Sequence, residues 1–96
     1  MSAPPQLLAH DHKDNVAVVV VEGLTAGTDA LGVITADDST FKLHVEADVP
    51  IGHKVALKDL KAGDTAIKYG EDIGKMVADV KKGGYVHVHN LKTKRW

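Results

Sequence analysis

The stretch VAVVVV, residues 16–21, is the longest apolar run of the chain and decides its fold class. Valine is stiff at its branched Cβ and favours extended strands. A run that is apolar at every position predicts a strand buried on both faces. Six residues are too few to cross a bilayer, and residues 1–14 lack the basic and apolar segments of a signal peptide. We therefore expect a cytoplasmic protein.

Further strands and turns are expected on both sides of this run. We expect extended segments at residues 7–9, 31–35, 41–47, 53–57, 66–69 and 85–89. Gly, Asp and Pro punctuate the chain between them, and Gly27 stands in a turn where positive φ is needed. This spacing, without sustained 3.6-residue periodicity, predicts a mainly β single small domain over residues 7–96, after a flexible lead at 1–6.

At most one or two short helical turns fit the pattern, at residues 59–61 and 72–76, and residues 72–74 also have the composition of a turn. The segments LTAGT (24–28) and LKAGD (60–64) share the pattern Leu-x-Ala-Gly-polar, each after an expected strand. The chain contains no exact internal repeat. Two related turns are therefore expected.

Charge and composition exclude several classes of function. The 96 residues carry a formal net charge of −1, with acids and bases interspersed. This balance argues against nucleic acid as the main partner, which requires a basic face. Cysteine is absent, so any metal would be bound by nitrogen and oxygen ligands.

The stretch YVHVHN, residues 85–90, is the strongest candidate for chemistry. His87 and His89 would point the same way on a strand, roughly 6–7 Å apart along it. They could share a metal or an anion, but a metal site needs at least a third protein ligand. His10, His12, His53 or a partner protein could supply it. The plainer alternative is two polar residues on the wet face of an edge strand.

Two further motifs combine cationic and hydrogen-bonding side chains. His53 and Lys54 follow Gly52, which lets a ligand approach closely, and Lys68 precedes Tyr69 and Gly70. An exposed amphipathic strand and a half-buried aromatic explain these segments equally well. Asn90 could orient an imidazole or bind a hydroxyl, and His10 stands near Asp14 in a turn that is otherwise a solvated loop.

Taken together, the motifs resemble the SAF domain found at the N-terminus of the altronate and galactarate dehydratase family. Four pieces carry the resemblance in this order: DNVAV at 14–18, IGHKVAL at 51–57, IKYG at 67–70 with IG at 73–74, and VHVHN at 86–90. The resemblance implies a β-clip fold. In the long form of this family the domain is joined to a large catalytic domain. This chain is similar to the separately encoded small subunits, which implies a large catalytic subunit as partner.

The resemblance implies a lyase acting on hydroxy acids. In that chemistry a base removes the proton α to a carboxylate, and a β-hydroxyl or a sulfonate leaves. A divalent metal, iron or manganese, would stabilise the enolate-like intermediate. The implied roles are as follows: His87, His89 and His10 as metal ligands; Lys54, Lys68, Gly70 and Asn90 in substrate binding; His53 and Tyr69 in catalysis.

The sequence leaves the substrate open among altronate, galactarate and sulfolactate, and it leaves the general base unassigned. The alternative function is a non-catalytic binding or assembly module, as SAF-like domains are in sialic acid synthases and in flagellar or pilus assembly proteins. Beyond the large subunit and a small carboxylate or sulfonate substrate, a homo-oligomer is possible. No nucleic acid or membrane partner is expected.

Overall fold

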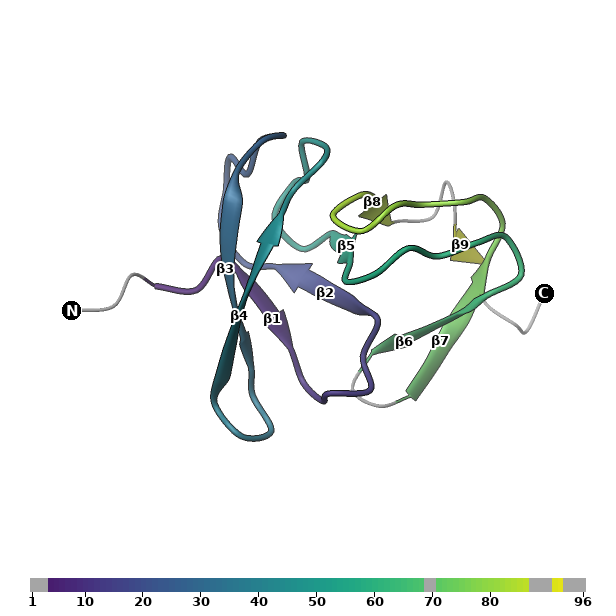
Figure 1. Ribbon diagram of the computed structural model, residues 1–96, viewed down its shortest axis with the longest axis horizontal. Coiled ribbons are helices and arrows are strands. Elements are labelled where there is room, and N and C mark those ends of the chain that lie inside the picture. Colours follow the sequence, from purple (N-terminus) through teal and green to yellow (C-terminus); the bar gives the residue numbers. More distant parts are fainter. Residues whose placement is uncertain (1–3, 69–70, 87–90, 93–96) are drawn as a thin grey trace.

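Short strands make up most of the regular structure in this computed structural model, which describes residues 4–68, 71–86 and 91–92 (Figure 1). The strands are β1 (Leu7–Ala9), β2 (Val16–Val19), β3 (Asp29–Ile34), β4 (Ser39–His44), β5 (Lys54–Ala56), β6 (Thr65–Lys68), β7 (Glu71–Met76), β8 (Tyr85–Val86) and β9 (Leu91–Lys92). The described residues contain no helix, and so none long and apolar enough to cross a membrane. The predicted mainly β fold is confirmed.

The strands form two sheets, with the valine run near the centre of the larger one. Six strands are ordered β4-β3-β1-β2-β5-β8, and β6, β7 and β9 form a second sheet. Only β1 and β3 run parallel within the described pairs. Val16, Ala17 and Val19 are fully buried, as predicted, but β2 ends at Val19 and Val20 is 37% exposed.

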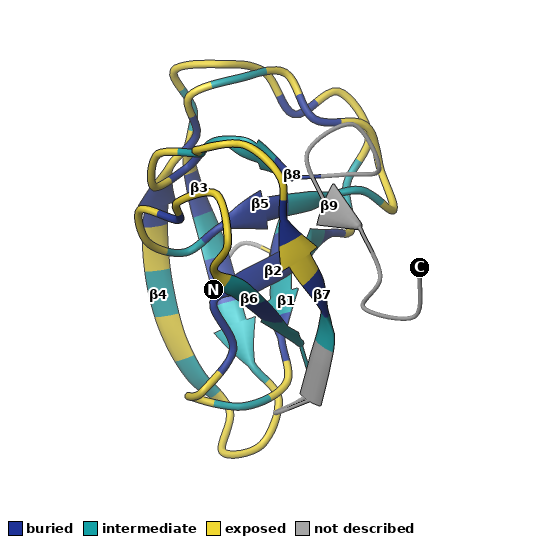
Figure 2. Cartoon of the chain, turned by 90° about the vertical axis from the view of Figure 1, so that its right-hand side faces the viewer, coloured by how far each residue is buried: buried dark blue, intermediate teal, exposed yellow. Residues whose placement is uncertain are grey.

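Two hydrophobic clusters share the central strands. In β5 the side chain of Val55 belongs to the first cluster and that of Ala56 to the second, because neighbouring residues of a strand face opposite ways. Figure 2 shows β2 and β5 buried between more exposed loops. The first cluster contains Leu7, Ala9, Ala17, Val19, Leu24, Ala30, Leu43, Val45, Val49 and Val55. The second cluster fills the space toward β6 and β7 and contains Val16, Ala56, Leu60, Ala66, Met76 and Val86. Burial thus joins the two sheets into one domain.

The two Leu-x-Ala-Gly turns belong to a structural duplication. Equivalent contacts recur in the two halves. The β-bridge between Leu24 and Val49 corresponds to the one between Leu60 and Val80. The bond from Ala26 N to Asp48 Oδ1 (2.9 Å) corresponds to that from Ala62 N to Asp79 Oδ1 (2.8 Å), and the bond from Gly27 N to Val45 O (2.7 Å) to that from Gly63 N to Met76 O (2.8 Å). Gly27 and Gly63 both have positive φ, at 89° and 96°. The weak sequence similarity therefore marks a repeated architecture.

Two local predictions are wrong. Residues 59–61 form no helical turn, since Leu60 is in a bridge with Val80. Residues 72–76 form neither a helical turn nor a chain reversal but lie in β7. The register of β6 and β7 shifts between Ala66 and Ile67, and such an irregularity accommodates a glycine inside a strand. Asp72 and Gly74 misled the sequence reading for this reason.

The expected lead over residues 1–6 ends in a residue that is hydrogen-bonded to the sheet. Gln6 donates its backbone N–H to Leu31 O (2.8 Å) and accepts a bond from Val20 N (2.9 Å). Its side-chain Oε1 also accepts from Leu31 N (3.1 Å). Gln6 therefore fastens the start of β1 to β3.

Candidate functional site

Lys54 and Lys68 lie close enough for their charges to interact. Lys54 is paired with Val18 on β2 and Val86 on β8, so its side chain is on the face of the second hydrophobic cluster. Burial, and then the charge of Lys68, lower the pKa of Lys54 below its ordinary 10.5. Two ammonium groups held near each other in a partly buried position form a potential site for an anion.

The strand that carries Lys68 is fastened to the larger sheet by Asn15. The side chain of Asn15 donates to Thr65 O (2.8 Å) and accepts from Ile67 N (2.6 Å). Its backbone N–H also donates to Ile67 O (3.0 Å). Asn15 is only 8% exposed, so these bonds satisfy a buried amide.

His53 directly precedes β5, and its side chain lies on the opposite side of the sheet from that of Lys54. Its Nδ1 is hydrogen-bonded to the hydroxyl of Tyr85, and the two rings stack with centroids 5.5 Å apart. Tyr85 is opposite Val55 and packs against the first cluster, whereas Lys54 faces the second. The structure therefore brings Lys54 to Lys68 and His53 to Tyr85, and it separates His53 from Lys54.

The described residues do not form a metal centre. Across residues 4–68, 71–86 and 91–92, no three His, Asp or Glu side chains gather in a way that could hold a metal ion. His10 is exposed, and its Nδ1 is hydrogen-bonded to Thr35 Oγ1 (2.9 Å). Asp14 accepts hydrogen bonds from the backbone N–H of His10 and of Asp11 (2.9 and 3.3 Å), so it holds the turn in shape.

Five predicted site residues lie outside the described residues. They are Tyr69, Gly70, His87, His89 and Asn90. Their assignments as catalytic, substrate-binding and metal-binding residues stay predictions.

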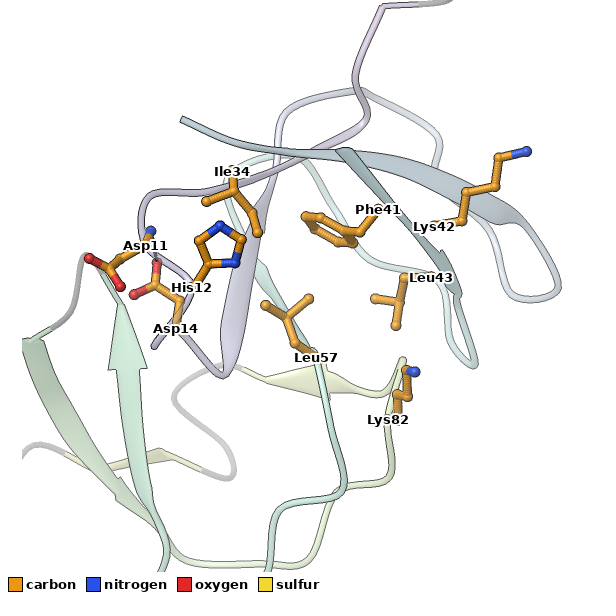
Figure 3. A pocket seen from close by; sticks show the side chains of 9 residues that line it. All are labelled: Asp11, His12, Asp14, Ile34, Phe41, Lys42, Leu43, Leu57 and Lys82. Atoms are coloured by element: carbon orange, nitrogen blue, oxygen red, sulfur yellow. Dashed lines mark hydrogen bonds between the residues drawn. The ribbon is translucent and has the colours of Figure 1, made fainter. Parts of the chain in front are cut away.

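A cavity of about 210 Å³ opens between the turn that joins β1 to β2 and the β3–β4 hairpin (Figure 3). Apolar side chains form its inner wall and charged ones surround it; its lining residues are Asp11, His12, Asp14, Ile34, Phe41, Lys42, Leu43, Leu57 and Lys82. A second, more open hollow of about 360 Å³ is lined by the loops at 23–25 and 48–50 and by Tyr85. The described residues that line these two cavities include neither Lys54 nor Lys68, so neither cavity coincides with the lysine pair.

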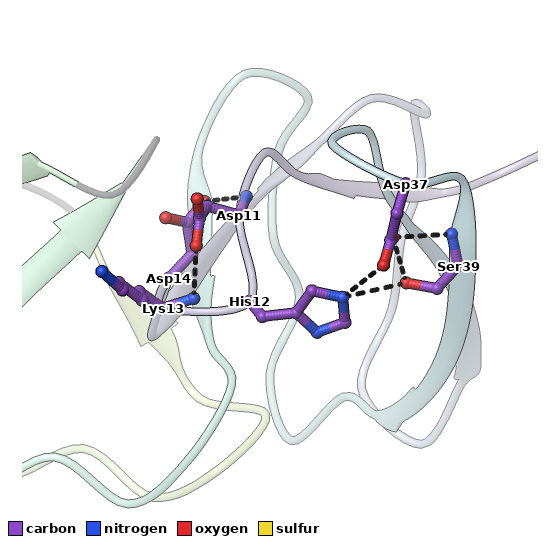
Figure 4. A network of polar contacts seen from close by, with 6 residues as sticks. All are labelled: Asp11, His12, Lys13, Asp14, Asp37 and Ser39. Atoms are coloured by element: carbon purple, nitrogen blue, oxygen red, sulfur yellow. Dashed lines mark hydrogen bonds and ion pairs between the residues drawn. The ribbon is translucent and has the colours of Figure 1, made fainter.

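His12, Asp37 and Ser39 bring together the residue types of a hydrolase triad, but not its geometry (Figure 4). The Nε2 atom of His12 contacts both Asp37 Oδ2 (2.7 Å) and Ser39 Oγ (3.5 Å). In a triad the serine and the carboxylate engage opposite ring nitrogens. Here the hydroxyl of Ser39 donates to Asp37 Oδ1 (2.6 Å), so the cluster fastens two surface turns together.

A family model for the altronate/galactarate dehydratase SAF domain matches residues 5–94 of the chain. The chain belongs to this SAF-domain family. It is 70% identical over 66 residues to the (2R)-sulfolactate sulfo-lyase subunit alpha of Paracoccus pantotrophus, covering 69% of this chain and 98% of that protein. It is 48% identical over 89 residues to the subunit of the same name from Chromohalobacter salexigens, covering 93% and 95% of the two chains.

Longer members of the SAF-domain family match over only part of their length. The altronate dehydratase of Escherichia coli is 42% identical over 80 residues, which are 83% of this chain and 15% of that enzyme. The small-subunit relatives are thus matched over nearly their whole length and the dehydratase over one segment. This agrees with the resemblance to separately encoded small subunits.

Sequence reasoning about this SAF domain missed Tyr85 and Asn15. The period-two rule places Tyr85 on the same strand face as the candidate His87, yet nothing local indicates that Tyr85 meets His53, which is 32 positions away. The side-chain partners of Asn15 are 50 and 52 positions away. No short-range signal could have revealed either contact.

Proposed function

We propose that the chain is the small subunit of a two-chain hydroxy-acid lyase, and that Lys54 and Lys68 bind the acidic groups of its substrate. The observation that carries this proposal is the lysine pair, in a chain whose relatives include sulfolactate sulfo-lyase alpha subunits. The preferred substrate is (2R)-sulfolactate. Its carboxylate and its sulfonate offer two negative charges to two ammonium groups.

Binding of an anion suits this arrangement physically. Burial disfavours the charged form of Lys54 and the neighbouring charge of Lys68 adds repulsion. A bound carboxylate or sulfonate relieves both effects. Charge neutralisation at the carboxylate also assists removal of the adjacent α-proton, because that step adds negative charge beside the carboxylate. Departure of the β-substituent, sulfite in this case, completes the elimination.

The remaining parts of the active site belong to a larger subunit in this proposal. The alpha-subunit name of the relatives supports a second chain. An iron or manganese ion would stabilise the enolate-like intermediate, with His87 and His89 as its ligands from this chain and His10 as a third candidate. The described residues alone do not form such a site. We propose that the complex works in the cytoplasm.

The test is reconstitution of the chain with its larger partner from the same genome. The complex should release sulfite from (2R)-sulfolactate, whereas altronate and galactarate should react poorly. Lys54→Met and Lys68→Met should each raise KM at least about thirtyfold, since loss of a charge-assisted hydrogen bond costs about 2 kcal/mol or more. Lys58→Met is the matched control, because Lys58 is an exposed lysine just after β5.

Three results would contradict parts of this proposal. A complex with no lyase activity on any of the three acids would favour the assembly-module alternative. Activity on a sugar acid in place of sulfolactate would change the substrate and keep the lyase. Wild-type KM in both lysine variants, with the complex intact, would remove the lysine pair from the substrate site.

A further inference from the structure

Asn15 makes bonds to both of the chain segments that carry the lysine pair. On one side it bonds β6 through Thr65 and Ile67, one residue before Lys68. On the other side its backbone carbonyl accepts from Leu57 N (2.9 Å), just after β5. Asn15 itself directly precedes β2. One residue therefore connects three strands at the place where the two sheets meet.

The chemistry of the side chain suits this task closely. The bonds to Thr65 O and Ile67 N require an acceptor and a donor on one short side chain. An asparagine amide supplies both. Aspartate lacks the donor, alanine lacks both groups, and glutamine is longer by a methylene. At 8% exposure, water is poorly placed to replace these bonds.

We propose that Asn15 is a positioning residue of the anion site, which sets the separation between Lys54 and Lys68 by holding β6 against the larger sheet. This inference rests on the proposed function of the lysine pair. The charge of Lys68 acts on Lys54, and the three hydrogen bonds that Asn15 makes to Thr65 and Ile67 hold β6, and with it Lys68, beside the larger sheet. Preorganised spacing matters because a binding group that is already held in its bound geometry loses less conformational freedom when the substrate binds.

The kinetic test uses Asn15→Ser and Asn15→Ala in the reconstituted complex. Each variant should raise KM for sulfolactate about tenfold and change kcat much less, because ground-state binding of the acidic groups is weakened. Gln6→Ala is the matched control. Gln6 is also an amide that holds a neighbouring strand, through Leu31 N at 3.1 Å, but it does so between β1 and β3. Its loss should leave KM unchanged. Asn15→Ser is the milder variant and serves if Asn15→Ala does not fold.

A second readout is independent of activity. In NMR titrations of the full chain with labelled lysine, Asn15→Ser should raise the pKa of Lys54, because β6 and the charge of Lys68 are then held less closely to the larger sheet. Gln6→Ala should not change it. The inference is overturned if both Asn15 variants keep the wild-type KM and the wild-type pKa of Lys54 while Lys68→Met changes them. If Lys68→Met leaves KM unchanged, the proposed function fails, and the pKa of Lys54 in Asn15→Ser still decides whether Asn15 sets the lysine spacing.

Discussion

Replacing Gly83 by alanine should destabilise the fold far more than the same change at Gly52. The two glycines occupy equivalent positions of the duplication and have φ angles of 85° and 86°, a region that costs an L side chain about 1–2 kcal/mol. Around Gly52 nothing lies within 4 Å of an added Cβ, whereas at Gly83 the Cβ would overlap the backbone carbonyl oxygen of His44. Only at Gly83 must the backbone move.

Two further effects lower the unfolding free energy of Gly83→Ala. Forcing a methyl group into a packed site costs about 1–3 kcal/mol. Moving Gly83 away from the end of β4 also weakens the bond from Glu46 N to Gly83 O, which is 2.9 Å long and worth about 1 kcal/mol. With the backbone contribution, Gly83→Ala should lose about 3–6 kcal/mol of unfolding free energy and Gly52→Ala about 1–2 kcal/mol.

Urea unfolding of the full chain at 25 °C, followed by far-UV circular dichroism, measures both values. In thermal unfolding each kcal/mol corresponds to about 4–8 °C in Tm for a domain of this size, so the two variants should separate clearly. A Gly83→Ala protein within about 0.5 kcal/mol of Gly52→Ala would refute the reasoning. It would mean that the turn before β8 is not held against β4.

Two titrations follow from the charged pairs. The hydrogen bond and charge of Asp37 raise the pKa of His12, so this contact stabilises the fold below pH 6.5 and is lost as pH rises through the raised pKa. Asp37→Asn should lower the pKa of His12 toward its ordinary value in an NMR titration and leave that of His44 unchanged. An equal shift at both histidines would contradict the pairing. Lys68→Met should raise the pKa of Lys54 but not fully to 10.5, because burial is the larger cause of its lowering. Stability should therefore rise less steeply with pH between the lowered pKa and 10.5 than in the wild type, and an unchanged pKa would show that the charges do not interact.

Strands with a clear local pattern were predictable from the sequence. The valine run has branched side chains at almost every position and forms the centre of the larger sheet. The alternating segment at 41–47 places Leu43 and Val45 inside and His44 outside. Strand β7 was missed because Asp72 and Gly74 are typical of turns, and only pairing with β6 makes an extended segment of them. The local sequence pattern therefore could not reveal the long-range pairing that makes residues 71–76 a strand.

Single residues of the candidate site were easier to predict from the sequence than which of these residues lie together. The period-two rule that places His87 and His89 on one face also separates His53 from Lys54, because these two are neighbours in the chain. The influence of Lys68 on Lys54 depends on how β6 is placed against the larger sheet, and Asn15 bonds β6 to that sheet across 50 positions of sequence. A single-sequence pattern holds no information about such a contact.

Residues at equivalent positions in the two halves of the duplication show which side chains the fold requires there and which it does not. The segments at 49–55 and 80–86 make the same bridges and the same positive-φ glycine turn, yet Lys54 of the first half corresponds to Tyr85 of the second. The architecture therefore tolerates an aromatic residue at this position and has no need of a cation. Partial burial disfavours the charged form of Lys54, and the nearby charge of Lys68 disfavours it further. In the proposed function, a bound anion favours the charged form of Lys54 and so opposes both effects.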